Sequence, residues 1–227
     1  SLNYQPSFMA LEERITPAFN TLISLNPTVG MSIVTAAGTT TFTATAAGAN
    51  VSSTDISSQL GSGNNVVINT GSAGTEAGNI SAPSITSISY NNEVNTSLTF
   101  QSGTGTGLVG DISLPNITLT APGSILVRAA RDFLGAGLNA QSLDVRAATG
   151  SITSTDSFTG TNLFLRSATG LGTLGTPLQT EVTNLTANTT ASGAGIFISE
   201  VDGLSLALAN AVNGIESNNG PIVLSTT

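Results

Sequence analysis

The feature that most constrains the fold is a phrase that returns about every twenty residues. It reads apolar, any, apolar, a short polar stretch, Gly and a further apolar residue. Alternation within the phrase is typical of a β-strand with one buried face. The first apolar residues lie 19, 26, 20, 22, 19 and 18 residues apart and are Leu98, Ile117, Leu143, Leu163, Leu185, Leu204 and Ile222. A repeat of this length predicts a solenoid of stacked β rungs.

Other positions of the phrase recur with the same period. A second apolar column follows the glycines and comprises Ile125, Ile152, Leu171, Ile196 and Ile215. The glycines predict a corner that needs positive φ or close backbone approach, at Gly123, Gly150, Gly170, Gly195 and Gly214. A second corner is predicted to stack asparagines, namely Asn116, Asn162 and Asn184.

These columns distinguish between fold classes. Helical repeats are longer than this one, and Gly, Ser and Thr disfavour helices. A β-sandwich also has short strands, but it gives no reason for a fixed register over six units. We therefore predict an all-β chain in which residues 31–227 form one parallel β-helix. Leu163, Leu165 and Val145 are expected inside, whereas Phe164 and Arg166 are expected outside and Phe164 should tolerate a polar replacement.

The first thirty residues differ in composition and are predicted to be an N-terminal extension. The stretch SFMALEERI could form about two helical turns between Ser7 and Pro17, or a frayed terminus. Its apolar residues could plug the end of the solenoid or bind a partner, and they are Phe8, Met9, Leu11, Ile15 and Phe19.

The charge balance excludes several partners. The chain has a net charge of −8, five arginines, no Lys and no His. Nucleic acids and anionic membranes both need basic patches, so we expect neither as a partner. The sequence has no Cys for thiolate metal sites and no apolar run long enough to span a membrane. We expect no metal and no cofactor.

Residues 56–85, ISSQLGSGNNVVINTGSAGTEAGNISAPSI, are followed by TSLTFQSG and GDISLPNITLTAPGSI. This text resembles the repeats of filamentous-haemagglutinin-like bacterial surface proteins, over about residues 50–227. The resemblance implies a right-handed parallel β-helix, secretion to the cell exterior, and a role in adhesion or surface structure. The segment LEERITPAF resembles a short N-terminal phrase of other very large bacterial surface proteins. Both resemblances imply a location on the bacterial cell surface.

Three arginines occupy one position of the phrase. Arg128, Arg146 and Arg166 lie 18 and 20 residues apart, so a β-helix would place them outward in adjacent rungs. Stacked like charges are unfavourable. Asp144, Asp132 and Glu181 could supply the counter-charge, which would leave ordinary surface ion pairs. The alternatives are a site for a carboxylated glycan or for the acidic surface of a neighbouring subunit.

The acidic residues do not suggest catalysis. The aspartates Asp111, Asp132, Asp144, Asp156 and Asp202 are spread singly, and no two are expected at matching rung positions. A chain without His or Lys would have to rely on carboxylates and arginine for proton transfer. We therefore expect a non-enzymatic, self-associating fibre subunit or adhesin stalk. The alternatives are a β-helical carbohydrate-active enzyme and a glycan-binding module.

The last residues, GPIVLSTT, predict a strand in the repeating register with no cap. Natural solenoids cover their open edges. We therefore expect this edge to meet further repeats of the same chain or a neighbouring subunit, head to tail. Removal of residues 1–20 should change assembly if that segment docks on a neighbour, and should lower thermal stability if it caps its own rung. A host or matrix glycan is a further candidate partner.

Overall fold

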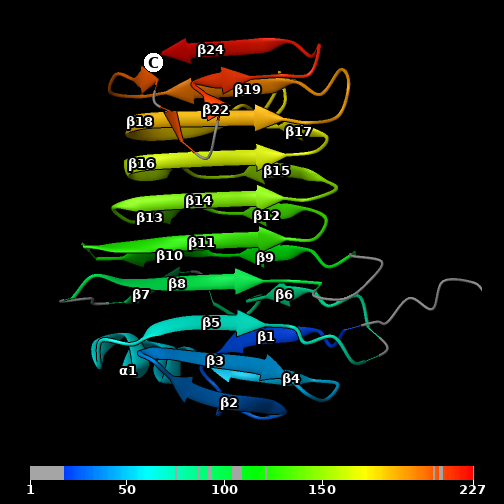
Figure 1. Cartoon of the computed structure of the whole chain (residues 1–227), viewed down its shortest axis with the longest axis vertical. Helices are drawn as coiled ribbons and strands as arrows, with labels where there is room; N and C mark the ends of the chain where they lie inside the picture. The colour runs from blue at the N-terminus through cyan, green and yellow to red at the C-terminus, as the bar shows by residue number, and fades with distance from the viewer. Residues whose placement is uncertain are drawn as a thin grey trace, which may run out of the picture.

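The computed structural model describes residues 18–74, 76–85, 87–90, 94–103, 109–120, 122–206, 208–209 and 212–226. Almost all regular structure in these residues is β, and the single helix among them is short. Most of the strands stack one above another along the long axis of the molecule (Figure 1). The prediction of an all-β chain is confirmed.

The stacked strands form three faces. Face A comprises β3 (Thr39–Ala44), β5 (Asn65–Asn69), β8 (Thr96–Gln101), β11 (Gly123–Ala129), β14 (Ser142–Ala147), the second halves of β16 (Phe158–Ser167) and β18 (Leu178–Thr189), β20 (Ser205–Leu206) and β23 (Ile215–Glu216). Face B comprises β4 (Ala49–Ser52), β1 (Thr21–Ser24), β6 (Ile80–Ser81), β9 (Ile112–Leu114), β12 (Phe133–Gly135), β15 (Ser151–Ser154), β17 (Gly170–Leu171), β19 (Ile196–Glu200) and β24 (Ile222–Thr226). Face C comprises β7 (Ser87–Tyr90), β10 (Asn116–Leu119), β13 (Leu138–Asn139), the first halves of β16 and β18, and residues 198–200 of β19, which pair with residues 178–180 of β18.

The chain visits the faces in a fixed order. From β8 it passes to β9, then β10, and returns to face A at β11, and the next rounds repeat this path. We call each such round a rung. Neighbouring rungs pair in parallel on all three faces. The antiparallel pairs of strands in the described residues are β2 (Met31–Ala36) with β3, and β21 (Leu208–Ala209) with β22 (Val212–Asn213).

Alternate residues of each strand point inward and build one apolar core. On face A the inward column is continuous over seven rungs, and it consists of Phe42, Ile68, Phe100, Val127, Val145, Leu165 and Ala187. Val145 is fully buried, and Leu163 is 2% exposed. The predicted inward orientation of Val145, Leu163 and Leu165 is confirmed.

The columns deduced from the repeat are right only in part. Leu143, Leu163 and Leu185 share one column on face A, and Ile152, Leu171 and Ile196 share one on face B. Five further assignments were to the wrong column or face, namely Ile117, Leu204, Ile222, Ile125 and Ile215. All three strands of a rung carry the same apolar alternation, so the phrase does not reveal which face it belongs to.

Corner residues differ similarly from expectation. Nδ2 of Asn184 donates to Oδ1 of Asn162 at 2.9 Å, so these two stack as predicted. Asn116 instead begins β10 on face C, where its Oδ1 accepts from the N–H of Gly137. Gly150 meets its predicted requirement for close backbone approach, because a Cβ there would lie 2.6 Å from the carbonyl oxygen of Arg131.

A helix and a hairpin lie at the N-terminal end of the stack. Helix α1 (Ser53–Gly61) lies beside β5 at this end (Figure 1), and Ile56 and Leu60 are fully buried in the core. Ser52 caps the helix, since its side chain accepts from the N–H of Thr54 at 3.2 Å. Strand β2 adds an antiparallel hairpin below β3. Both elements depart from the uniform parallel structure predicted from residue 31.

Strand β1 lies within residues 1–30, the predicted extension, and it pairs in parallel with β4 and β6 on face B. The predicted helix over SFMALEERI lies outside the described residues.

The C-terminal end of the stack is open in the described residues. Strand β24 pairs with β19 along one edge and with no described strand along the other. All five of its residues are exposed, including Ile222, Val223 and Leu224. Ile196 and Ile198, the partners of Ile222 and Leu224 one rung below, are 0% and 1% exposed. The core columns therefore continue into β24 without a covering layer.

Candidate functional site

Five polar residues form a row across face A. Gln101, Arg128, Arg146, Arg166 and Asn188 are direct register partners in five successive strands. We call them the arginine row. The residues on either side of each arginine point inward or pack at the corner, so the three guanidinium groups lie on the outer surface. The predicted outward placement in adjacent rungs is confirmed.

Asp144 neutralises part of the row. Its Oδ2 accepts from Nη2 of Arg128 at 2.7 Å, and its Oδ1 accepts from Nε of Arg146 at 2.8 Å. One carboxylate therefore separates two guanidinium groups that would otherwise stack as like charges. The prediction that Asp144 supplies counter-charge is confirmed.

The other two predicted counter-charges do not reach the row. Asp132 forms an ion pair with Arg131 at a corner, with 3.4 Å between Oδ2 and Nε. Glu181 lies on face C opposite Thr159. Arg166 is exposed, and within the described part of the chain it has no carboxylate within ion-pair distance. The predicted roles of Asp132 and Glu181 beside the row are wrong, because these residues occupy other corners and faces.

Phe164 is outward but not exposed. It is the register partner of Asp144, and its side chain is only 5% exposed. The guanidinium carbon of Arg146 lies 4.8 Å from the centre of its ring, in cation–π contact. The expectation that Phe164 lies exposed on the surface is therefore wrong, because Arg146 covers its ring, and its tolerance of a polar replacement stays a prediction.

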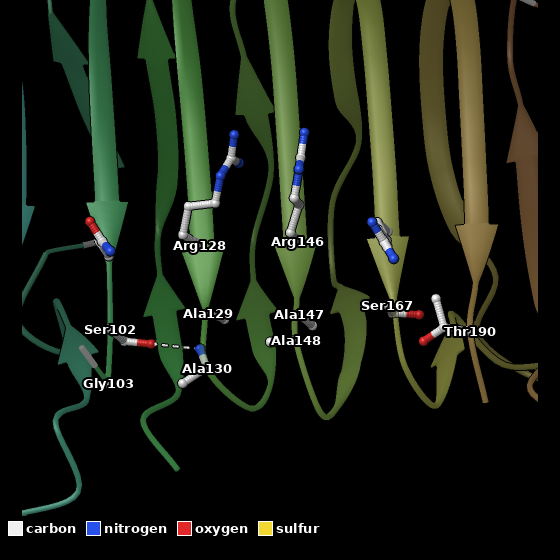
Figure 2. A pocket seen from close by; sticks show the side chains of 12 residues that line it. Ser102, Gly103, Arg128, Ala129, Ala130, Arg146, Ala147, Ala148, Ser167 and Thr190 are labelled. Atoms are coloured by element: carbon white, nitrogen blue, oxygen red, sulfur yellow. Dashed lines mark hydrogen bonds between the residues drawn. The ribbon is translucent and has the colours of Figure 1, made fainter. Parts of the chain in front are cut away.

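A groove of about 480 Å³ runs beside the arginine row where the strands of face A end. Figure 2 shows Arg128 and Arg146 side by side on neighbouring strands, above Ala130, Ala148 and the hydroxyl-bearing residues of the groove. Oγ of Ser102 accepts from the N–H of Ala130 at 3.1 Å and donates to the carbonyl of Gly110 at 2.8 Å. Small side chains therefore leave space next to the cationic row.

A second polar row stacks at the corner before face B. The side-chain oxygens of Asn20, Asn79, Asp111 and Asp132 each accept from the backbone N–H at the matching position of the next rung, ending at Ser151, at 2.7–3.1 Å. We call this the corner ladder. It places Asp111 and Asp132 at matching positions in adjacent rungs, so the expectation that no two aspartates match is wrong. The 21-residue spacing of Asp111 and Asp132 was the available signal.

Arg131 makes this carboxylate pair possible. It donates to both oxygens of Asp111 and forms the ion pair with Asp132. Burial raises the pKa of Asp111, but the hydrogen bonds from Arg131 and from the N–H of Asp132, with the charge of Arg131, bring the pKa below its ordinary value. Each oxygen of the pair has a partner in the protein, so the pair serves the fold.

One buried carboxylate escaped prediction. Glu200 points inward at the C-terminal end of the stack and is 2% exposed. It accepts from the hydroxyl of Thr180 and, at 3.0 Å, from the N–H of Val182. The sequence signal was its place in the inward alternation of β19.

Of the predicted apolar contact residues, the structure describes only Phe19. Phe8, Leu11 and Ile15 are outside the described residues. Phe19 is half-buried next to β1, where its N–H donates to the carbonyl of Thr70 at 3.2 Å. Over the described ranges, no cluster of three or more acidic residues has the spacing of a metal site, and no helix is long and apolar enough to cross a membrane.

Comparisons with known proteins give no match: no family model, no curated protein and no solved structure is significantly similar to the chain.

Proposed function

We propose that the chain is a non-enzymatic structural protein of the bacterial cell surface, secreted to the exterior, where it forms part of a fibre or an adhesin stalk. Its fold in this proposal is a right-handed parallel β-helix. The repeated order of faces A, B and C supports this fold, since each return to a face adds one parallel strand. Connections between parallel strands of one sheet are almost always right-handed.

The open end at β24 carries the proposal that the stack continues. Ile222 and Leu224 stand in the inward columns, and they are 45% and 44% exposed. A following rung would bury both side chains and pair the free backbone edge. That rung comes from further repeats of the same chain or from a second copy, stacked head to tail.

The state of three aspartates supports a scaffold over a catalyst. Asp144 is held by two arginines, and Asp111 and Asp132 are held by Arg131 and the corner ladder. A general base needs an oxygen free to take a proton from substrate. The chain also has no His and no Lys.

The second candidate is a carbohydrate-active enzyme or glycan-binding module, and the groove beside the arginine row favours it. The two candidates differ in turnover. The purified chain should release no product from a panel of polysaccharides. Reproducible turnover that is lost in Asp132→Asn or Asp144→Asn would reverse the ranking.

Assembly can be tested with two neighbouring substitutions in β24. Leu224→Asp places a charge where the next rung would pack, whereas Val223→Asp places the same charge on the outward side. Light scattering and electron microscopy of the 227-residue chain should show concentration-dependent assembly in the parent and in Val223→Asp, and loss of assembly in Leu224→Asp. Strictly monomeric parent protein at high concentration would refute head-to-tail assembly of this chain.

A further inference from the structure

The arginine row carries positive charge that the fold leaves uncompensated. It contains three arginines, and Asp144 is the single carboxylate in ion-pair contact with them among the described residues. The row therefore has a net charge of about +2 on a chain whose net charge is −8. Arg166 makes no ion pair there, and Arg146 uses Nε and Nη2 but not Nη1.

The spacing of the row is set by the backbone. Neighbouring rungs lie about 4.8 Å apart, so the row offers a guanidinium or amide group at each such step along the stacking axis. Amides of Gln101 and Asn188 extend it beyond the arginines at both ends. The ligand that matches this row is a chain lying along the axis with acceptor groups at a similar repeat.

The groove beside the row suits a ring with polar and apolar edges. Among its alanines only Ala148 is exposed and offers a methyl group, whereas Ala129, Ala130 and Ala147 are 2–3% exposed and their methyl groups are buried. Thr190 is exposed and adds a hydroxyl group, whereas Ser102 and Ser167 are 3% and 1% exposed, so their hydroxyl groups lie below the surface of the groove (Figure 2). The side-chain oxygen of Ser167 is buried and has no hydrogen-bond partner in the protein. Hydroxyl, amide and methyl groups together match the surface of a sugar.

The structure already contains one carboxylate bound by the row. Asp144 lies between Arg128 and Arg146 and receives hydrogen bonds from both. The guanidinium group is planar and matches a carboxylate with two parallel donors. Arg166, one rung further along, presents the same donors without an acceptor.

We propose that this groove binds an extended polysaccharide that carries one carboxylate per sugar, a polyuronate, with Arg166 as the principal contact. An acidic peptide in extended form presents the side chains of one face every second residue, about 6.7 Å apart, wider than the rung spacing of about 4.8 Å, and polyglutamate is therefore the competing ligand in the test. The site goes beyond the proposed scaffold role, and it is independent of whether the chain assembles.

The test measures binding of polygalacturonate to the whole chain by calorimetry at low ionic strength. Arg166→Gln should weaken binding about tenfold, the effect of losing a charged hydrogen bond. Ser89→Asp lowers the net charge equally from an exposed position on face C, and it should leave the affinity within about twofold. Circular dichroism checks that each variant is folded.

A gain of affinity is also expected. Asp144→Asn removes the internal competitor and frees two guanidinium groups, so binding should tighten by about threefold. Unchanged or weaker binding by folded Asp144→Asn contradicts the proposal.

Three further outcomes overturn it. One is absence of binding to polygalacturonate, and another is equal binding after its carboxylates are reduced to alcohols. The last is equal or tighter binding of polyglutamate with the same dependence on Arg166, which would assign the groove to an acidic protein. None of these outcomes bears on assembly through β24, which light scattering tests separately.

Discussion

At the N-terminal end of the stack, α1 and the β2–β3 hairpin lie against the rungs, whereas at the C-terminal end β24 leaves its inward residues exposed. Leu60 of the helix is fully buried, and Leu224 of β24 is 44% exposed. Both residues stand at an end of the same core. The difference lies in the helix, which closes the core at one end; the outermost strand there, β2, still exposes Ile33 and Val34 at 53% and 57%.

The corner ladder also differs between the N-terminal and C-terminal rungs. Its hydrogen-bonding side chains run from Asn20 to Ser151, and the matching positions of the later rungs are Gly170, Gly195 and Pro221. At this corner the N-terminal rungs are therefore linked by side chains as well as by the sheet, whereas the C-terminal rungs are linked by side chains at other places, such as Asn162 with Asn184.

The largest expected effect on the free energy of unfolding comes from placing a carboxylate at the N-terminal end of the stack, compared with the same change at the C-terminal end. Leu60→Asp buries a carboxylate in the core and should cost several kcal/mol of unfolding free energy. Leu224→Asp should cost much less, about 1 kcal/mol, because its side chain is already 44% exposed in the single chain. Urea unfolding at concentrations where the chain is monomeric measures both. Similar losses in the two variants would break the comparison.

A smaller effect is expected at the helix cap. Ser52→Ala removes the side chain that accepts from the N–H of Thr54, and it should cost about 1 kcal/mol. Ser53→Ala, one residue later, is the matched control and should cost less. The same unfolding assay applies, and equal losses would show that Ser52 does not support the cap through this hydrogen bond.

The smallest expected effect is a pH dependence of folding stability that comes from Asp111 in the corner ladder. Because the folded pKa of Asp111 is below its ordinary value, Asp111 contributes stability above its unfolded pKa, and this stability is lost as the pH falls through the folded pKa. Asp111→Asn should therefore be less stable than the parent near neutral pH, and the difference should shrink below pH about 4. Unfolding curves across this range test it, and a difference that does not change with pH would contradict the assigned cause.

Register partners and inward positions could be predicted from the sequence where the spacing of the repeat is constant and apolar residues alternate. Arg146 and Arg166 belong to nearly identical phrases, and the structure places them in register. Leu163 and Leu185 were found in the same way. Ile117 was assigned to the wrong face, because strands on all three faces share one pattern and the connections between them vary in length.

Features without a repeat were beyond prediction. Helix α1 has mostly Ser, Thr, Asp and Gly, which favour helices weakly, and only Ile56 and Leu60 mark its buried side. The Asp111–Asp132 pair was hidden because recognising matching positions requires the register of rungs that differ in length. Phe164 points outward but is buried, because the side chain of Arg146 lies over its ring. The apolar alternation of the strand does not specify the direction of that arginine side chain.

β16 and β18 each turn the corner from face C to face A as one uninterrupted strand. A residue added inside such a strand would reverse the orientation of every side chain after it, so these corners cannot accept insertions. The connection from face B to face C is different: between β17 and β18 it is a turn closed by Thr173 and Thr176, with Leu174 75% exposed. A foreign loop grafted at Leu174 would therefore be displayed at one edge of the stack while the rungs on either side keep their register.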